Sequence, residues 1–139
     1  MKHSFEQKVY YADTDSYGVV WHGSYLRWME MGRCLWCDSV GLDLIDLDKN
    51  HDIVIPVVGL NIRYKMSAKL GDEMIVETEC LKFNSLSATF KQVIKSKETG
   101  KVFIEAEVEV VAIASSTGKL HRRMPEILLK AFEREFACV

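Results

Sequence analysis

The sequence predicts an α+β fold, in which one long helix packs against one face of an antiparallel sheet. Residues 23–40 carry apolar side chains at the spacing of one helical face. One strand-like segment precedes this helix and four follow it. In the last of them, residues 104–110 alternate strictly between apolar side chains and glutamate, as a sheet with one solvated face requires. The 139 residues fit one domain, 1–139, which is large enough to bury a core.

The first elements are a strand, a polar loop and the long helix. We expect a strand at residues 5–11 and a loop at 12–18. The helix is expected at about 23–40, and Gly41 follows at the position where a glycine closes a helix. Gly32 on its apolar face would let the helix approach a sheet closely. The expected buried face comprises Tyr25, Trp28, Met29, Gly32, Leu35, Trp36 and Val40.

The rest of the chain is dominated by strands. We expect them at residues 53–65, 73–83, 86–97 and 104–110, followed by a short helix that Pro125 opens. A solvated loop is expected between the long helix and the second strand. The pattern Asp46-x-Asp48-x-Asn50 in this loop imitates a calcium-binding loop. However, His51 stands where such a loop needs glycine, and Val57 stands where it needs glutamate.

Composition argues against several classes of function. The formal net charge of −2 lacks the basic excess of nucleic-acid-binding proteins. No stretch approaches the ~18 uninterrupted apolar residues of a membrane helix, and the N-terminal residues lack the apolar core of a secretory signal. We therefore expect a cytoplasmic protein with no nucleic-acid partner and no membrane insertion. The cysteines Cys34, Cys37, Cys80 and Cys138 are expected to be buried thiols, without a zinc site.

The segment most informative about function joins the first strand to the long helix. It reads Tyr11-Ala-Asp-Thr-Asp-Ser-Tyr-Gly-Val-Val-Trp-His-Gly-Ser-Tyr25. Its pattern is D-x-D-x-x-G, then a hydrophobic residue, valine, an aromatic residue, histidine and, three residues later, tyrosine. This pattern resembles the signature of the hotdog thioesterases related to 4-hydroxybenzoyl-CoA thioesterase. Within that superfamily it is most similar to the bacterial acyl-CoA thioesterases associated with the Tol–Pal system.

The resemblance implies a fold, an activity and an assembly. The fold is the hotdog, a long central helix wrapped by a curved antiparallel sheet of about five strands. The activity is hydrolysis of an acyl-CoA to free acid and CoA, with no cofactor and no metal. Short or medium aliphatic acyl-CoA, aromatic acyl-CoA and acyl carrier protein thioesters all remain open as substrates. The expected assembly is a homodimer or homotetramer, with the tetramer favoured.

The resemblance also assigns roles to residues of the motif. Asp15 is the expected catalytic carboxylate, acting as nucleophile or as general base. The backbone N–H at about His22 is expected to polarise the carbonyl, since a helix N-terminus offers unpaired donors and a favourable dipole. The His22 imidazole would orient the thioester or share proton transfer. Gly18 would supply the tight turn beside the substrate, and Tyr25 would lie at the substrate site.

Structural roles compete with each of these assignments. An aspartate-rich loop before a helix is also the ordinary pattern of a turn and a helix cap. Asp13 is expected to be structural, bonding loop amides, and Tyr25 to pack with its hydroxyl satisfied nearby. Glu30 lies in the helix, where a different hotdog branch has its catalytic carboxylate, but here the loop aspartate is the stronger candidate.

Basic side chains are expected to hold the phosphates of CoA. One candidate group is Arg63, Lys65 and Lys69, and the other is the run His121-Arg122-Arg123. Each of these residues can equally be a solvated surface charge. The rival to an enzyme is a non-catalytic hotdog protein that binds acyl-CoA as a sensor or scaffold. A hotdog dehydratase is a third possibility, but the motif does not fit that class.

Overall fold

The computed structural model describes residues 2–137 and contains five strands and three α-helices within them. In chain order the elements are β1 (Lys2–Lys8), the 3-10 turn η1 (Tyr11–Asp13), α1 (His22–Ser39), α2 (Leu44–His51), β2 (Val57–Tyr64), β3 (Glu73–Phe83), β4 (Ser87–Ser96), β5 (Val102–Val111) and α3 (Glu126–Ala137). The strands form one sheet in the order β1-β3-β4-β5-β2, and every neighbouring pair is antiparallel. The predicted α+β class is therefore confirmed.

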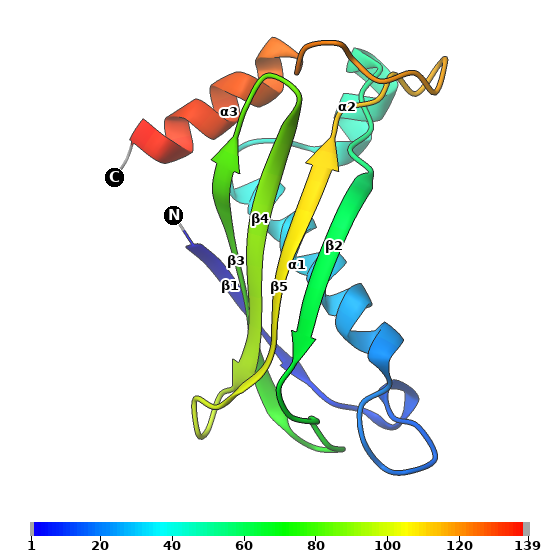
Figure 1. Ribbon diagram of the computed structural model, residues 1–139, viewed down its shortest axis with the longest axis vertical. Helices are drawn as coiled ribbons and strands as arrows, with labels where there is room; N and C mark the ends of the chain where they lie inside the picture. The colour runs from blue at the N-terminus through cyan, green and yellow to red at the C-terminus, as the bar shows by residue number, and fades with distance from the viewer. Residues whose placement is uncertain (1, 138–139) are drawn as a thin grey trace.

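Helix α1 runs behind the sheet, from the loop that precedes it at one end toward α2 and α3 at the other (Figure 1). Its predicted apolar face is the face that packs on the sheet: Tyr25, Trp28, Met29, Gly32 and Trp36 are buried. The C-terminus closes as expected, because Gly41 has φ +81° and donates its N–H to Asp38 O at 3.1 Å. Leu42 N–H donates to Cys37 O at 2.8 Å and completes the Schellman motif.

The helix approaches the sheet most closely at Gly32. A Cβ atom at this position would lie 2.5 Å from Thr78 Oγ1 and 3.0 Å from Gln92 Nε2. Gln92 is fully buried, and its Nε2 donates to Met29 O and to Thr78 Oγ1, both at 2.8 Å. Its Oε1 accepts from Arg33 Nη1 at 2.9 Å. The side chain of Gln92 thus ties two points of α1 to the middle of the sheet, and hydrogen bonds satisfy both of its ends.

The first strand is shifted relative to its prediction, since it begins at Lys2 and not at Phe5, and the second strand is shorter than predicted. The first strand ends at Lys8 and not at Tyr11, because the chain turns into η1, where Asp13 Oδ2 accepts the Tyr10 N–H at 2.9 Å. The strand predicted at 53–65 begins only at Val57. Pro56 lies directly before it and has no N–H to donate to the ladder.

A helix stands where a solvated loop was expected. Helix α2 begins after Asp43, whose side chain accepts from the N–H groups of Ile45 at 2.9 Å and Asp46 at 3.2 Å. This is an ordinary N-cap. The side chain of Leu47 anchors the helix in the core, where it is 1% exposed. The prediction of a loop at residues 46–50 was therefore wrong, and the Asp43 cap followed by apolar residues at helical spacing was the overlooked signal.

Candidate active site

The loop between η1 and α1 is closed on itself. Thr14 forms an isolated antiparallel bridge with Val20, and Asp15 N–H donates to Val19 O at 2.9 Å. Gly18 N–H donates back to Asp15 O at 3.1 Å. Gly18 has φ +79°, a left-handed conformation that glycine adopts without a steric penalty. The closed loop therefore brings Asp15 beside Val19, close to the start of α1.

The loop is attached to the connection between β2 and β3. Val20 N–H donates to Ala68 O at 2.9 Å, and Val19 forms a bridge with Lys69. Val20 and Ala68 are both buried. The backbone on the α1 side of the loop is thus fixed by the body of the protein, whereas the side chains at its tip stay exposed, as Tyr17 shows at 88% exposure.

Asp13 ties the start of the loop to the start of the helix. Its carboxylate accepts the Tyr10 N–H and pairs with the Arg27 guanidinium, and the residue is only 3% exposed. Its backbone carbonyl accepts the Trp21 N–H at 2.9 Å and the Ser24 hydroxyl at 3.1 Å. Asp13 therefore makes the loop-amide bond that was expected of it, and in addition it bonds the first turn of α1.

Asp15 lies in the loop between η1 and α1 and is partly exposed. Its Oδ1 accepts the Tyr17 N–H at 2.8 Å, which is the bond of an Asx turn. This bond orients the carboxylate group, since rotation about the Cα–Cβ bond would break it. The carboxylate remains accessible to solvent and to a substrate.

The first turn of α1 presents free backbone donors. Helix α1 begins at His22, and the N-cap residue, Trp21, makes no capping hydrogen bond with its side chain. Ser24 N–H donates to Trp21 O at 2.9 Å. Within residues 2–137, no acceptor is bonded to the N–H groups of His22 and Gly23. Such donors at the positive end of a helix form a site for a negatively charged oxygen.

The His22 side chain packs beside the aromatic ring of Tyr64. Its exposed imidazole meets the edge of Tyr64 with ring centroids 5.2 Å apart, and Tyr64 in turn lies 5.8 Å from Tyr25. Tyr25 is 2% exposed, and its hydroxyl oxygen accepts the Ala68 N–H at 3.0 Å. Burial raises the pKa of this hydroxyl, so it stays protonated. Tyr25 thus packs with its hydroxyl satisfied; whether it also contacts substrate stays a prediction.

Tyr64 was not among the residues singled out from the sequence. It belongs to β2, where Ile62 and Tyr64 face α1 and the intervening Arg63 faces the opposite side of the sheet. The alternation of apolar and polar side chains along this strand was the signal that could have found it. Its partner His22 could not be read from that alternation, because the contact joins distant parts of the chain.

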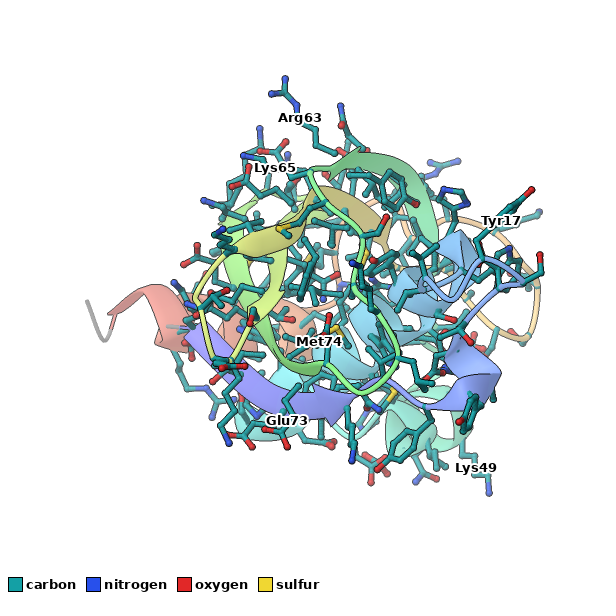
Figure 2. All side chains as sticks on the ribbon, turned by 90° about the horizontal axis from the view of Figure 1, so that it is seen from below. Tyr17, Lys49, Arg63, Lys65, Glu73 and Met74 are labelled. Atoms are coloured by element: carbon teal, nitrogen blue, oxygen red, sulfur yellow. The ribbon has the colours of Figure 1, made fainter. Side chains whose placement is uncertain are left out.

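The structure does not bring Arg63 and Lys65 together with Asp15 within one chain. Both lie on the outer side of the sheet, where Arg63 is in register with Glu105 and Lys65 Nζ pairs with Glu105 Oε2 at 3.3 Å. Figure 2 shows them projecting from the sheet well apart from Tyr17 on the loop. Of the basic candidates, Lys69 is the one whose backbone lies beside the loop. The contact of Arg63 and Lys65 with substrate therefore stays a prediction.

Three cysteines, Cys34, Cys37 and Cys80, lie in α1 and β3, away from this loop. Cys37 is buried and Cys34 half-buried in the C-terminal half of α1. Burial raises the pKa of the Cys37 thiol to about 12 and that of Cys80 to about 11, so neither is a thiolate near neutral pH. Cys138 lies outside the described residues. In the described part of the chain no three histidine, cysteine, aspartate or glutamate side chains gather to hold a metal, and no helix is long and apolar enough to cross a membrane.

A separate apolar cavity of about 280 Å³ lies beside the C-terminal half of α1. Its lining residues come from α1, α2, the start of β2, β4, β5 and α3, and include Cys34, Cys37, Leu44, Ile55, Phe90 and Phe132. The polar side chains of Glu30 and Arg33 also line it. Because Ile55, Pro56 and Val57 form one wall, the cavity lies at the open edge of the sheet.

Comparison with known proteins identifies related chains. A family model described as the thioesterase-like superfamily matches residues 9–132. The acyl-CoA thioesterase YbgC of Haemophilus influenzae is 34% identical over 105 residues, which cover 71% of this chain and 77% of that protein. The acyl-CoA thioester hydrolase YbgC of Escherichia coli O6:H1 is 29% identical over 127 residues, covering 91% and 92% respectively.

A solved structure shares the fold. The structure of 4-hydroxybenzoyl CoA thioesterase from Pseudomonas sp. strain CBS-3 matches with a TM-score of 0.84, over 94% of this chain and 98% of that chain. The two sequences are 19% identical. The predicted hotdog fold is thereby confirmed.

Asp13 gives a test of how the loop is held. We expect Asp13→Ala to lower the free energy of unfolding by about 1–3 kcal/mol, because it leaves the Tyr10 N–H and the Arg27 guanidinium without their acceptor. Urea denaturation followed by circular dichroism measures the loss. Asp38→Ala, which removes an exposed carboxylate from α1, is the control and should have little effect. Equal stability of the two variants would show that Asp13 does not anchor the loop.

Proposed function

The chain belongs to the thioesterase-like superfamily, as its sequence motif predicted, and from this premise we propose that it hydrolyses an acyl-CoA thioester to free acid and CoA. One observation carries the proposal. The closed loop that carries the Asp15 carboxylate leads directly into a helix start with two free N–H groups. The two YbgC proteins that it resembles are acyl-CoA thioesterases, and this supports the same substrate class here.

The free amides of His22 and Gly23 supply the electrostatic part of the mechanism. When a nucleophile adds to a thioester carbonyl, negative charge develops on the oxygen. Backbone donors fixed at the positive end of α1 stabilise that charge without needing to reorganise. A serine or aspartate at the N-cap would bond the N–H of Gly23 or Ser24 with its own side chain, whereas Trp21 makes no such bond.

Asp15 supplies the chemical part. As a nucleophile its carboxylate would attack the carbonyl carbon, expel CoA thiolate and leave a mixed anhydride, which water then hydrolyses. As a general base it would take a proton from a water molecule that attacks the same carbon. In both routes the carbon–sulfur bond breaks, CoA leaves as a thiol after protonation, and one water molecule is consumed. Neither route requires a metal or a redox cofactor.

The His22 imidazole has a secondary role in the hydrolysis, beside the main role of Asp15. It is exposed, follows Trp21 directly and rests against the edge of Tyr64. From this position it can orient the thioester or pass a proton to the leaving sulfur. The Tyr64 contact limits the rotation of the ring, which favours a fixed orientation toward the substrate.

The rival function is a protein that binds acyl-CoA without hydrolysing it. A binding protein has no need for a carboxylate beside the carbonyl, and the Asp15 loop therefore favours the enzyme. Release of free thiol from a substrate panel, measured with a colorimetric thiol reagent, separates the two. The panel should include short and medium aliphatic acyl-CoA, aromatic acyl-CoA and an acyl carrier protein thioester. The free thiols of Cys34, Cys37 and Cys80 support a reducing, cytoplasmic setting for this reaction.

We further propose that the chain works as a homodimer joined at β2. This strand is one edge of the sheet, and it exposes Val57, Val58, Leu60 and Tyr64. An apolar edge strand of this kind is a ready site for pairing with a second copy. Such pairing would also cover the apolar cavity beside Val57.

A tetramer, which the sequence resemblance favours, needs a second interface between dimers. The outer face of the sheet is one candidate for it, yet Lys2 and Lys95 both pair with Glu77 there, and Lys65 pairs with Glu105. A face covered by ion pairs offers little apolar area to bury. The tetramer therefore stays a proposal that depends on another surface.

The first test concerns Asp15. Asp15→Asn keeps the size of the side chain and an oxygen for the Tyr17 N–H but removes the charge. We expect the hydrolysis rate on the best substrate to fall at least about 10²-fold, the typical effect of losing such a group. Asp48→Asn, an exposed carboxylate on α2, is the control and should leave the rate unchanged. A folded Asp15→Asn enzyme that matched the control would remove Asp15 from the mechanism.

The second test separates the His22 side chain from its backbone. His22→Phe leaves the N–H in place, so we expect activity to persist and the loss to be smaller than for Asp15→Asn. Rates should be measured between about pH 5 and about pH 9, since histidine is a common general acid and base. A changed pH profile would assign proton transfer to the ring. If His22→Phe were as inactive as Asp15→Asn while still folded, the imidazole would be a principal acid or base.

The third test concerns assembly. Light scattering at micromolar concentration should give at least a dimer for the wild-type chain. Leu60→Lys places a charge on the exposed edge strand and should produce monomers, as lysine on edge strands does in natural proteins. Ile45→Lys, at an exposed position on α2, is the control and should leave the assembly intact. A wild-type monomer would contradict the proposed dimer.

A further inference from the structure

Trp21 combines a rigid backbone with an exposed side chain. Its N–H donates to Asp13 O and its carbonyl accepts from Ser24 N–H, both at 2.9 Å. The indole, however, is 60% exposed, whereas Trp28 and Trp36 are each 1% exposed. Tryptophan is also a poor residue for an N-cap position. A large apolar side chain held in solvent, at a position where it does not help the helix, is a candidate for contact with a ligand.

Gly23 lets the indole lie against the helix. A Cβ atom at residue 23 would lie 2.2, 2.4 and 2.7 Å from Cζ3, Cη2 and Cε3 of Trp21. The six-membered part of the indole therefore occupies the space that the side chain of any other residue would need. A glycine in the first turn weakens the helix, and packing of the indole is what this particular glycine permits.

The position of the indole identifies its ligand. In the chain, Trp21 follows the loop of Asp15 and directly precedes His22 and Gly23, whose N–H groups are free. The indole lies against Gly23, so a carbonyl oxygen bound to the Gly23 N–H would bring its acyl substituent near the ring. We propose that Trp21 is an apolar contact surface for the acyl group of the substrate, and that Gly23 holds this surface in place. The inference rests on the proposed thioesterase function and adds a determinant of acyl preference to it.

The contact between Trp21 and the acyl group is tested by measuring kcat/KM on acyl-CoA substrates of increasing chain length. Octanoyl-CoA covers more of the indole than acetyl-CoA does, so Trp21→Ala should lower the octanoyl-to-acetyl ratio of kcat/KM by about tenfold or more. Gly23→Ala should shift the ratio in the same direction, because the new methyl group displaces the indole. In the double variant Gly23→Ala should add nothing, since the indole is already absent. Tyr11→Ala removes another exposed aromatic ring near the loop and should leave the ratio unchanged.

A binding measurement tests the contact without turnover. Because Trp28 and Trp36 are buried, acrylamide should quench mainly the emission of Trp21. The non-hydrolysable thioether S-octyl-CoA should protect this emission, S-ethyl-CoA should protect it less, and Trp21→Phe should abolish the difference. Trp21 that is already protected in the ligand-free protein would mean that a second copy covers it, and would overturn the inference.

The outcomes separate this inference from the proposed function. Suppose that the wild-type protein hydrolyses these thioesters, and that Trp21→Ala leaves the octanoyl-to-acetyl ratio of kcat/KM unchanged or raises it. This result would overturn the contact role of Trp21 and leave the thioesterase proposal standing. If the wild-type protein hydrolysed no thioester of the full substrate panel, the proposed function would fail, and the thioether experiment would still decide whether Trp21 contacts the alkyl chain.

Discussion

The close packing of α1 on the sheet is the constraint on which the candidate active site depends. The helix is held by its buried face, from Tyr25 to Trp36, and at its middle by the Gly32 contact and by the hydrogen bonds of Gln92 to Met29 and Arg33. Because it packs as a rigid rod, its first turn cannot shift unless the buried face also shifts. The donors at His22 and Gly23 therefore have a defined position, and the Asp15 loop is built around that fixed point. Precision at the site comes from packing some distance away from it.

Local rules of helix construction are broken at one end of α1 and obeyed at the other. The C-terminus closes with Gly41 and a full Schellman motif. The N-terminus has tryptophan at the N-cap, glycine in the first turn and two unsatisfied N–H groups. Each of these features costs helix stability, and all of them lie beside Asp15. Such clustering is expected where a protein gives up local stability for function.

The sequence was sufficient for features that depend on local periodicity. Helix α1 differs from its predicted bounds by one residue at each end, and β3 coincides with its prediction, because both have a clear apolar repeat. Helix α2 was missed because its polar residues dominate a short segment, and the first strand was extended too far because the Asp13 carboxylate draws the chain into a turn.

Features that depend on contacts between distant residues could not be predicted from the sequence. Nothing local pairs His22 with Tyr64 or places Gln92 under Gly32. The motif suggested Asp15 and the helix start, since these residues are neighbours in the chain. The side of the sheet that carries Arg63 and Lys65 became clear only once the strand register was known.

The strand order has a consequence for how the protein folds. Strands β3, β4 and β5 form a meander joined by short turns, so they can pair early at a small entropic cost. Strands β1 and β2 occupy opposite edges of that meander, and the chain between them, including α1, must cross the entire sheet. These contacts are non-local and are expected to form late. An intermediate with only the meander would lack both the loop of Asp15 and the start of α1. Recovery of activity during refolding should therefore report the last folding step, in which β1, α1 and β2 pack onto the meander.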